Sequence, residues 1–192
     1  AFFVGTAGWS LSRGDQMSFP PEGTHLERYA AVFDGAEINA SFYRPLRPEL
    51  YAKWAASTRE DFRFAVKLPK AITHEARLVG CGPLLDAFAQ QVAGLGSRLG
   101  PLLVQLPPKL ELDAVVADEF FEAMRERFDG PIVVEPRHAS WFDDAAAARI
   151  VDRHRIGRVA ADPARVPAAA EPGGHPGVAY YRLHGSPRIY WS

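Results

Sequence analysis

The stretch that decides the fold is residues 132–141, which read Ile132-Val133-Val134-Glu135-Pro136-Arg137-His138-Ala139-Ser140-Trp141. It begins with the continuous apolar run that is typical of a parallel strand covered on both faces. The run stops at an acid, a base and an imidazole. Side chains at the C-terminal end of a barrel strand face the active site, so this stretch predicts both a buried strand and a functional site.

Further short apolar stretches occur along the chain, and segments with helical spacing separate them. The expected strands are residues 2–6, 36–41, 64–68, 102–106, 132–135, 157–161 and 178–183. The expected helices are residues 26–33, 48–57, 82–99, 115–128 and 143–154. Strict alternation of strands and helices indicates a parallel α/β sheet, either a barrel or an open doubly wound sheet. The phosphate-binding glycines of a dinucleotide fold are absent after the first strand, which favours the barrel.

The sequence therefore predicts a parallel (β/α) TIM-barrel-like fold with seven strands, in a single domain over residues 1–192. A complete barrel of this kind has eight strands and at least roughly 200 residues, so we expect the last βα unit to be absent from this chain. An open barrel would leave unpaired backbone groups on its first and last strands.

Composition excludes several classes of protein. The 192 residues are 47% hydrophobic and 23% charged, as in an ordinary globular domain. The net charge of -1 provides no overall field that would favour nucleic acid or an anionic membrane surface. No apolar run reaches the roughly 20 residues of a membrane span, and the single cysteine, Cys81, excludes an internal disulfide. We interpret the chain as a cytoplasmic protein without a membrane partner, and the sequence leaves the oligomeric state open.

Polar side chains gather at the ends of the expected strands. Residues two apart on a strand point to the same side. Three strands carry such polar pairs, Glu37 with Asn39, Glu135 with Arg137, and Arg182 with His184. Single polar groups follow three other strands, namely Lys67, Gln105 and Asp162. In a closed barrel all of these positions converge on one cavity at the C-terminal face.

The charges at these strand ends favour a small anionic substrate. Lys67, Arg137 and Arg182 stand among carboxylates, an arrangement typical of a clamp for a phosphate or carboxylate group. Our leading hypothesis is an enzyme that acts on a phosphorylated or carboxylated metabolite by acid/base chemistry. The candidate catalytic residues are Glu135, His184 and Glu37. The candidate substrate-binding residues are Lys67, Arg137, Arg182, Asn39, Tyr43, Trp9, His74, Gln105, His138 and Trp141.

Three alternatives stay open. Glu135 and Arg137 could form a purely structural ion pair that sets the register of the barrel. The chain could instead be a non-catalytic nucleic-acid or phosphodiester binder, in which Trp141 and Tyr43 stack on bases. A metal-assisted phosphoester hydrolase is the third alternative. Its divalent metal would be held by Glu37, Glu135, Asp162 and His184. The neighbouring cations would repel such an ion, so a divalent metal is not favoured and no other cofactor is evident.

Seven ordered motifs resemble the YecE-like family, domain of unknown function 72. They are residues 5–10 (GTAGWS), 37–43 (EINASFY), 64–67 (FAVK), 72–74 (ITH), 105–108 (QLPP), 135–141 (EPRHASW) and 181–185 (YRLHG). The resemblance covers nearly the whole chain. It implies a TIM-barrel-like fold and a shared set of polar positions, and it implies no particular reaction.

Overall fold

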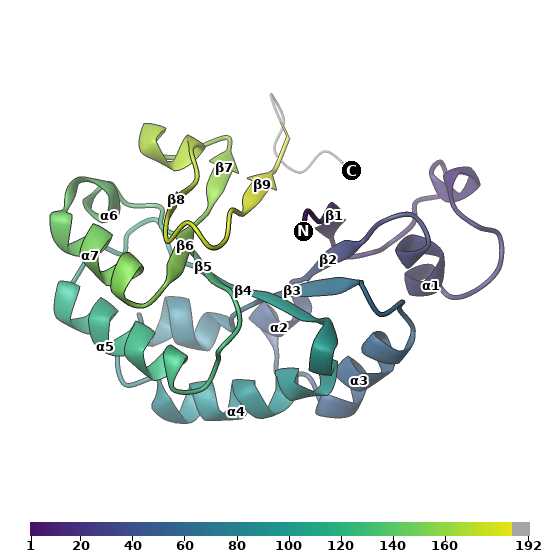
Figure 1. Ribbon diagram of the computed structural model, residues 1–192, viewed down its shortest axis with the longest axis horizontal. Coiled ribbons are helices and arrows are strands. Elements are labelled where there is room, and N and C mark those ends of the chain that lie inside the picture. Colours follow the sequence, from purple (N-terminus) through teal and green to yellow (C-terminus); the bar gives the residue numbers. More distant parts are fainter. Residues whose placement is uncertain (186–192) are drawn as a thin grey trace. The chain divides into compact units, whose positions relative to one another are not determined.

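The computed structural model describes residues 1–185 (Figure 1). These residues form two compact units. The first contains residues 1–69 and 87–101, and the second contains residues 70–86 and the chain from Leu102 onward. The strands form a mostly parallel sheet of seven strands and a separate sheet of two.

The first unit contains the first strands and the helices between them. Its strands are β1 (Gly5–Ala7), β2 (Gly35–Ile38), β3 (Arg63–Lys67) and the start of β4 (Leu99–Gln105). Its helices are η1 (Gln16–Ser18), α1 (His25–Ala30), α2 (Ala40–Tyr43), α3 (Pro48–Ala56) and η3 (Ala93–Arg98). Helix α1 begins at a capping box, in which the Thr24 side chain accepts from the Glu27 N–H and the Glu27 carboxylate accepts from the Thr24 N–H.

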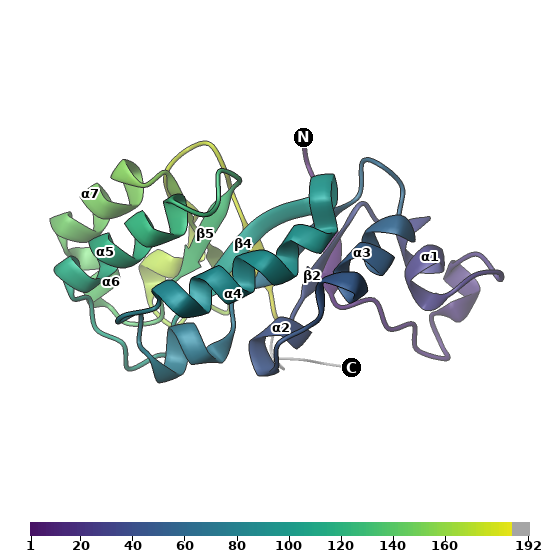
Figure 2. The same cartoon turned by 90° about the horizontal axis from the view of Figure 1, so that it is seen from below.

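The second unit contains the remaining strands. They are the end of β4, β5 (Ile132–Glu135), β6 (Ile156–Arg158), β7 (Ala160–Asp162), β8 (Gly173–Gly174) and β9 (Tyr181–Leu183). The helices are η2 (Ala71–Glu75, a π-helical turn), α5 (Ala114–Arg125), α6 (Ser140–Asp143), α7 (Ala145–Arg153) and η4 (Pro167–Ala170), and the unit boundary falls within α4 (Gly82–Val92). Figures 1 and 2 show α5 and α7 side by side, and α7 packs against β6.

The strand order of the large sheet is β1-β2-β3-β4-β5-β6-β8. The pairs β1 with β2, β2 with β3, β4 with β5, and β5 with β6 are parallel, as the alternation of strands and helices predicts. The register of β4 and β5 places Gln105 directly opposite Glu135. The carboxyl ends of these two strands therefore bring an amide and a carboxylate together.

The apolar run at residues 132–134 is a fully buried strand. Ile132, Val133 and Val134 have no exposed surface. Val133 forms a core cluster with Leu103 and Val159 of the same unit. Burial of a single aliphatic side chain contributes about 1.5–3 kcal/mol, so this run stabilises the strand that carries Glu135.

The expected strand at residues 157–161 is divided between the two sheets. The N–H of Val159 donates to the Val134 carbonyl at 2.9 Å, whereas the N–H of Ala160 donates to the Tyr180 carbonyl at 2.9 Å. Val159 itself lies between the two strands, and the residues before it pair in the large sheet whereas those after it pair in the small one. One expected strand thus becomes β6 and β7.

The expected parallel barrel needs correction. The large sheet has two ends, β1 and β8, and no closed barrel is found among the described residues. Its last strand is antiparallel, because β8 lies in the segment 163–177, which is rich in Pro and Gly, and pairs back onto β6. The architecture is a mixed α/β fold with a mostly parallel sheet. No helix in residues 1–185 is long and apolar enough to cross a membrane.

Candidate functional site

The centre of the candidate site is the carboxylate of Glu135, at the C-terminal end of β5. Its Oε1 accepts from Arg137 Nε at 2.9 Å and its Oε2 accepts from Arg182 Nη1 at 2.6 Å. Gln105 Nε2 donates to both oxygens at 3.1 Å. We call Gln105, Glu135, Arg137 and Arg182 the Glu135 cluster. All four residues belong to the second unit.

Local sequence and strand pairing together position this cluster. Pro136 has no N–H, so pairing along β5 stops there and Arg137 lies just beyond the strand. Arg182 comes from β9, where it is opposite Ala161 of β7. The step of the chain from β6 to β7 therefore determines where the second arginine lies relative to Glu135.

Two guanidinium groups hold Glu135 in its ionised form. Burial alone raises the pKa of this carboxyl, because desolvation disfavours the charged state. The charges of Arg182 and then of Arg137, with hydrogen bonds from Arg182 and Gln105, outweigh burial and lower the pKa below its ordinary value. The cluster contains one negative and two positive side chains, so its net charge is positive.

The two arginines differ in exposure. The side chain of Arg182 is 7% exposed and that of Arg137 is 19% exposed. Arg137 bonds through Nε alone, and its terminal nitrogens make no hydrogen bond to any of residues 1–185. Arg137 is therefore the member of the cluster that can offer donors to a ligand.

Two histidines lie on the segments that carry the arginines. The main-chain N–H of His184 donates to the Asp162 carbonyl at 2.7 Å, which extends the pairing of β7 and β9 to this residue. His138 Nδ1 is 3.0 Å from Ser140 Oγ, and the Ser140 N–H donates to the same nitrogen at 3.3 Å. Nδ1 of His138 therefore acts as an acceptor for the Ser140 N–H.

Two other predicted site residues of the second unit make internal contacts. His74 lies in η2, where its Nδ1 is 2.8 Å from Thr73 Oγ1. Trp141 is buried, and its indole N–H donates to the Leu110 carbonyl at 3.0 Å. The polar group of Trp141 is thus engaged, which leaves only its ring carbons for contact with a ligand.

Polar side chains also lie in the first unit, at the ends of β2 and β3. Glu37 and Lys67 are buried, and Lys67 Nζ lies 3.8 Å from the centre of the Phe42 ring. This contact is a cation–π interaction. Asn39 Oδ1 is buried and accepts no hydrogen bond from the described residues. A buried amide oxygen without a donor is unusual, so Asn39 can accept from a ligand.

The aromatic candidates of the first unit have opposite environments. The Trp9 ring packs edge-on against Trp54 at 5.0 Å and Phe64 at 5.8 Å, which favours a packing role. Tyr43 is 71% exposed at the end of α2. The predicted site residues are divided between the two units. The first unit contains Trp9, Glu37, Asn39, Tyr43 and Lys67, and the second contains His74, Gln105, Glu135, Arg137, His138, Trp141, Arg182 and His184.

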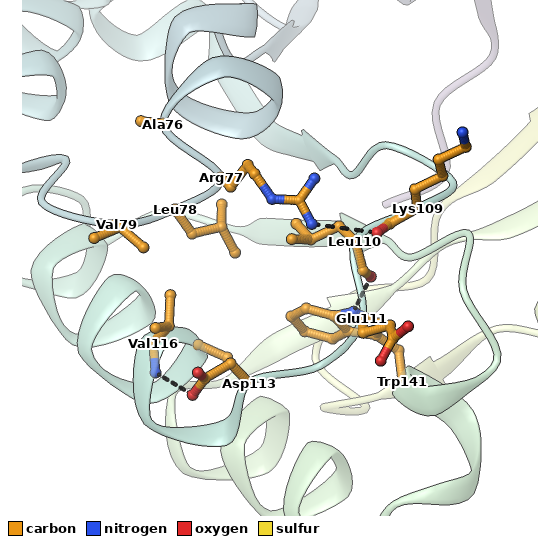
Figure 3. Close-up of a pocket in the computed structure, with 11 residues that line it drawn as sticks. Ala76, Arg77, Leu78, Val79, Lys109, Leu110, Glu111, Asp113, Val116 and Trp141 are labelled. Carbon is orange, nitrogen blue, oxygen red and sulfur yellow. Dashed lines mark hydrogen bonds between the residues drawn. The ribbon is translucent and has the colours of Figure 1, made fainter.

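Sequence reasoning missed one feature, a hollow of about 450 Å³ in the second unit (Figure 3). Arg77 and Lys109 lie at its rim, and no motif drew attention to either of them. Within residues 1–185, no group of three or more His, Cys, Asp or Glu side chains has a geometry that could hold a metal ion.

The fold and the Glu135 cluster define an α/β protein with polar side chains at the carboxyl ends of parallel strands. This arrangement is shared by many unrelated functions, so it does not by itself name an activity. The chain belongs to the family described as "Protein of unknown function DUF72", which matches residues 3–192. The resemblance expected from the motifs is confirmed.

Relatives and solved structures agree with this membership. The chain is 30% identical to the UPF0759 protein YecE of Escherichia coli K12 over 87% of its length, and it spans 61% of that protein. It is 27% identical to the UPF0759 protein YunF of Bacillus subtilis over 73% of its length and spans 52% of that protein. A crystal structure of a DUF72 family protein from Enterococcus faecalis V583 matches with a TM-score of 0.74 at 22% identity, covering 95% of this chain and 73% of that one. One from Thermotoga maritima matches with a TM-score of 0.71 at 26% identity, covering 95% and 74%.

Proposed function

We propose that this protein is an enzyme that binds a small phosphorylated or carboxylated substrate at the Glu135 cluster and acts by acid/base chemistry. The observation that carries the proposal is the pairing of two guanidinium groups with one buried carboxylate. Glu135 orients both guanidinium groups, and the terminal nitrogens of Arg137 stay available for a ligand.

Arg137 supplies the donors for the substrate anion. Its Nε is held by Glu135 at 2.9 Å, which orients the planar guanidinium. The terminal nitrogens then present a fork that matches two oxygens of a phosphate or carboxylate group. Preorganisation of this kind lowers the entropy that is lost on binding.

Glu135 serves this site as a positioning residue. A general base should have a pKa close to the operating pH, whereas the pKa of Glu135 is lowered and both of its oxygens accept hydrogen bonds. We assign proton transfer in the second unit to His184, which follows Arg182 by two residues and shares its side of the chain by alternation. Glu37 stays the candidate acid/base group of the first unit.

Binding of inorganic phosphate tests the anion site. A ligand that binds only the folded state raises the melting temperature by mass action. We expect phosphate to raise it for the native protein and for Arg149→Gln, which removes an exposed arginine of α7, and not for Arg137→Gln. Equal shifts for the two variants would refute binding at Arg137.

Turnover tests the catalytic part of the proposal. Phosphorylated and carboxylated metabolites would be incubated with the protein and followed by proton NMR for the appearance of products. We expect one class to be converted, conversion to be lost in His184→Asn, and phosphate binding to survive in that variant. If phosphate binds and no compound of either class is converted, the protein is a binder and the assignment of proton transfer is wrong.

A further inference from the structure

Three side chains of the second unit form a series of contacts just beyond the carboxyl end of β5. Ser140 is the first residue of α6, and its Oγ lies 3.0 Å from Nδ1 of His138. On the other side of the ring, His138 Nε2 lies 3.9 Å from Oε1 of Glu111. A hydroxyl, an imidazole and a carboxylate in this order are the groups that activate a serine nucleophile, and either ring nitrogen can act as the base.

The hydrogen bonds of Ser140 direct its hydroxyl proton to the histidine. The main-chain N–H of Leu112 donates to Ser140 Oγ at 2.8 Å, so this oxygen already serves as an acceptor. Within the described part of the chain, Nδ1 of His138 is the acceptor that Oγ reaches. Because a hydroxyl has a single proton to donate, the proton of Ser140 points to Nδ1, where a base can remove it. The Leu112 N–H also favours the ionised oxygen, since a hydrogen bond to a charged form stabilises that form.

A capping role alone does not explain these contacts. The Ser140 N–H also donates to His138 Nδ1, at 3.3 Å, as the main chain at the start of a helix commonly does to a nearby side chain. The hydroxyl oxygen is closer to the same nitrogen, at 3.0 Å, and α6 has only four residues to be capped. The cap holds the ring in place, and the hydroxyl is in position to use the ring as a base.

These side chains are open to a small molecule. The His138 side chain is 34% exposed and that of Glu111 is 77% exposed. Ser140 is partly exposed, and Ala139, between the serine and the histidine, is exposed and carries only a methyl group. A substrate can therefore approach from solvent without opening the core.

We propose that Ser140 is the nucleophile of a second reactive centre, which hydrolyses small carboxylic esters with His138 as the base. Oγ attacks the carbonyl carbon while Nδ1 takes its proton, the bond to the alkoxy group breaks, and His138 returns the proton to the leaving alcohol. Water then attacks the acyl-serine, again giving its proton to His138, which passes it to Ser140 as the carboxylic acid leaves. Glu111 is a positioning residue, whose charge favours the imidazolium. The centre shares no residue with the Glu135 cluster, so it is independent of the function proposed above.

Diisopropyl fluorophosphate tests the nucleophile in the native protein. The serine oxygen attacks phosphorus, fluoride leaves and His138 takes the proton, so a stable phosphoester stays on the reactive serine. We expect peptide mapping by mass spectrometry to find the adduct on Ser140 and not on Ser12, an exposed serine whose hydroxyl contacts Asp15 rather than a histidine. The absence of an adduct on Ser140 of the native protein would overturn the proposal, whether or not any variant folds.

Release of p-nitrophenolate from p-nitrophenyl acetate tests the base. His138→Asn should slow hydrolysis by about 100-fold, the lower end of the usual contribution of a general base. His175→Asn is the matched control and should leave the rate unchanged. His175 Nδ1 faces Asp152 Oδ1 at 4.0 Å, but no serine hydroxyl contacts its ring within residues 1–185. Equal rates for the two variants, both shown to be folded by circular dichroism, would overturn the proposal.

Glu111→Gln tests the positioning role with the same ester. It should slow hydrolysis about two- to fivefold, as expected for the loss of an exposed ion pair. The melting temperature should stay unchanged, because the Glu111 side chain is 77% exposed. A rate equal to that of the native protein would remove Glu111 from the centre.

Discussion

Arg182 Nη1 lies 2.6 Å from Glu135 Oε2, which joins two side chains that are 47 residues apart in the sequence. Both side chains are almost fully buried, with 7% and 4% of their surfaces exposed. A buried ion pair is weak evidence for stability in itself, but removing one partner leaves the other charge without compensation. The pair therefore connects the stability of β9 to that of β5.

Loss of the Glu135 charge should destabilise the fold strongly. Glu135→Gln removes the negative charge that the buried Arg182 and the partly buried Arg137 share, and the expected loss is about 3–5 kcal/mol in the free energy of unfolding. Urea unfolding followed by circular dichroism measures it, with Glu122→Gln on exposed α5 surface as the control. A loss below about 1 kcal/mol, the usual size for an exposed pair, would show that the cluster is open to water.

The contribution of Glu135 should disappear in acid. Because its pKa in the folded protein lies below the ordinary value of 4.5, the stabilisation is complete above pH 4.5 and is lost as the pH falls through the lowered pKa. The difference in unfolding free energy between the native protein and Glu135→Gln should therefore be constant near neutral pH and shrink below pH 4.5. Urea titrations over this range measure it. A difference that stays constant into acid would contradict the lowered pKa.

Gly157 permits a close approach that a side chain would block. A Cβ at this position would lie 2.7 Å from Val178 Cγ1 and 2.8 Å from the Val178 carbonyl oxygen. Gly157→Ala should therefore lower the unfolding free energy by about 1–3 kcal/mol, the usual effect of overpacking. Gly130→Ala is the matched control, because a Cβ there meets nothing within 4 Å. Similar unfolding midpoints for the two variants would argue against this packing.

Asp118 should stabilise the packing of α5 against α7. Its Oδ1 lies 2.7 Å from Nε2 of the buried His154, and its Oδ2 accepts from Arg153 Nη1 at 2.9 Å. Asp118→Ala leaves the imidazole buried without its acceptor, and the expected loss is about 1–3 kcal/mol. Glu119→Ala, at an exposed position of the same helix, should change stability by less than about 0.5 kcal/mol. Thermal and urea unfolding of both variants provide the measurement.

Much of the fold could be predicted because the signal is local. The apolar run at residues 132–134 and the alternation of strands and helices indicate buried parallel strands, and both the burial and the parallel pairing of β4 with β5 confirm this. The division of one expected strand into β6 and β7 could not be predicted, because it depends on β6 pairing with β5 and β7 pairing with β9. Strand propensity contains no information about which strand a given N–H will meet.

The hollow was missed for a related reason. The left-handed backbones of Arg77 and Leu78 occur in residues that ordinarily avoid this region, so residue type gives no warning. Lys109 follows two prolines in an unremarkable polar loop. Only the folded chain brings the main chain of that loop next to Arg77.

The sequence by itself determined that this chain has buried parallel strands, that acidic, basic and amide side chains follow them, and that its motifs are those of the DUF72 family. The tertiary structure decided that the sheet does not close among the described residues and that Glu135 accepts hydrogen bonds from both Arg137 and Arg182. The physical reason is the separation along the sequence. Burial and strand–helix alternation follow from patterns of neighbouring residues, whereas the partner of a charged side chain depends on which distant strand the fold brings within hydrogen-bonding distance.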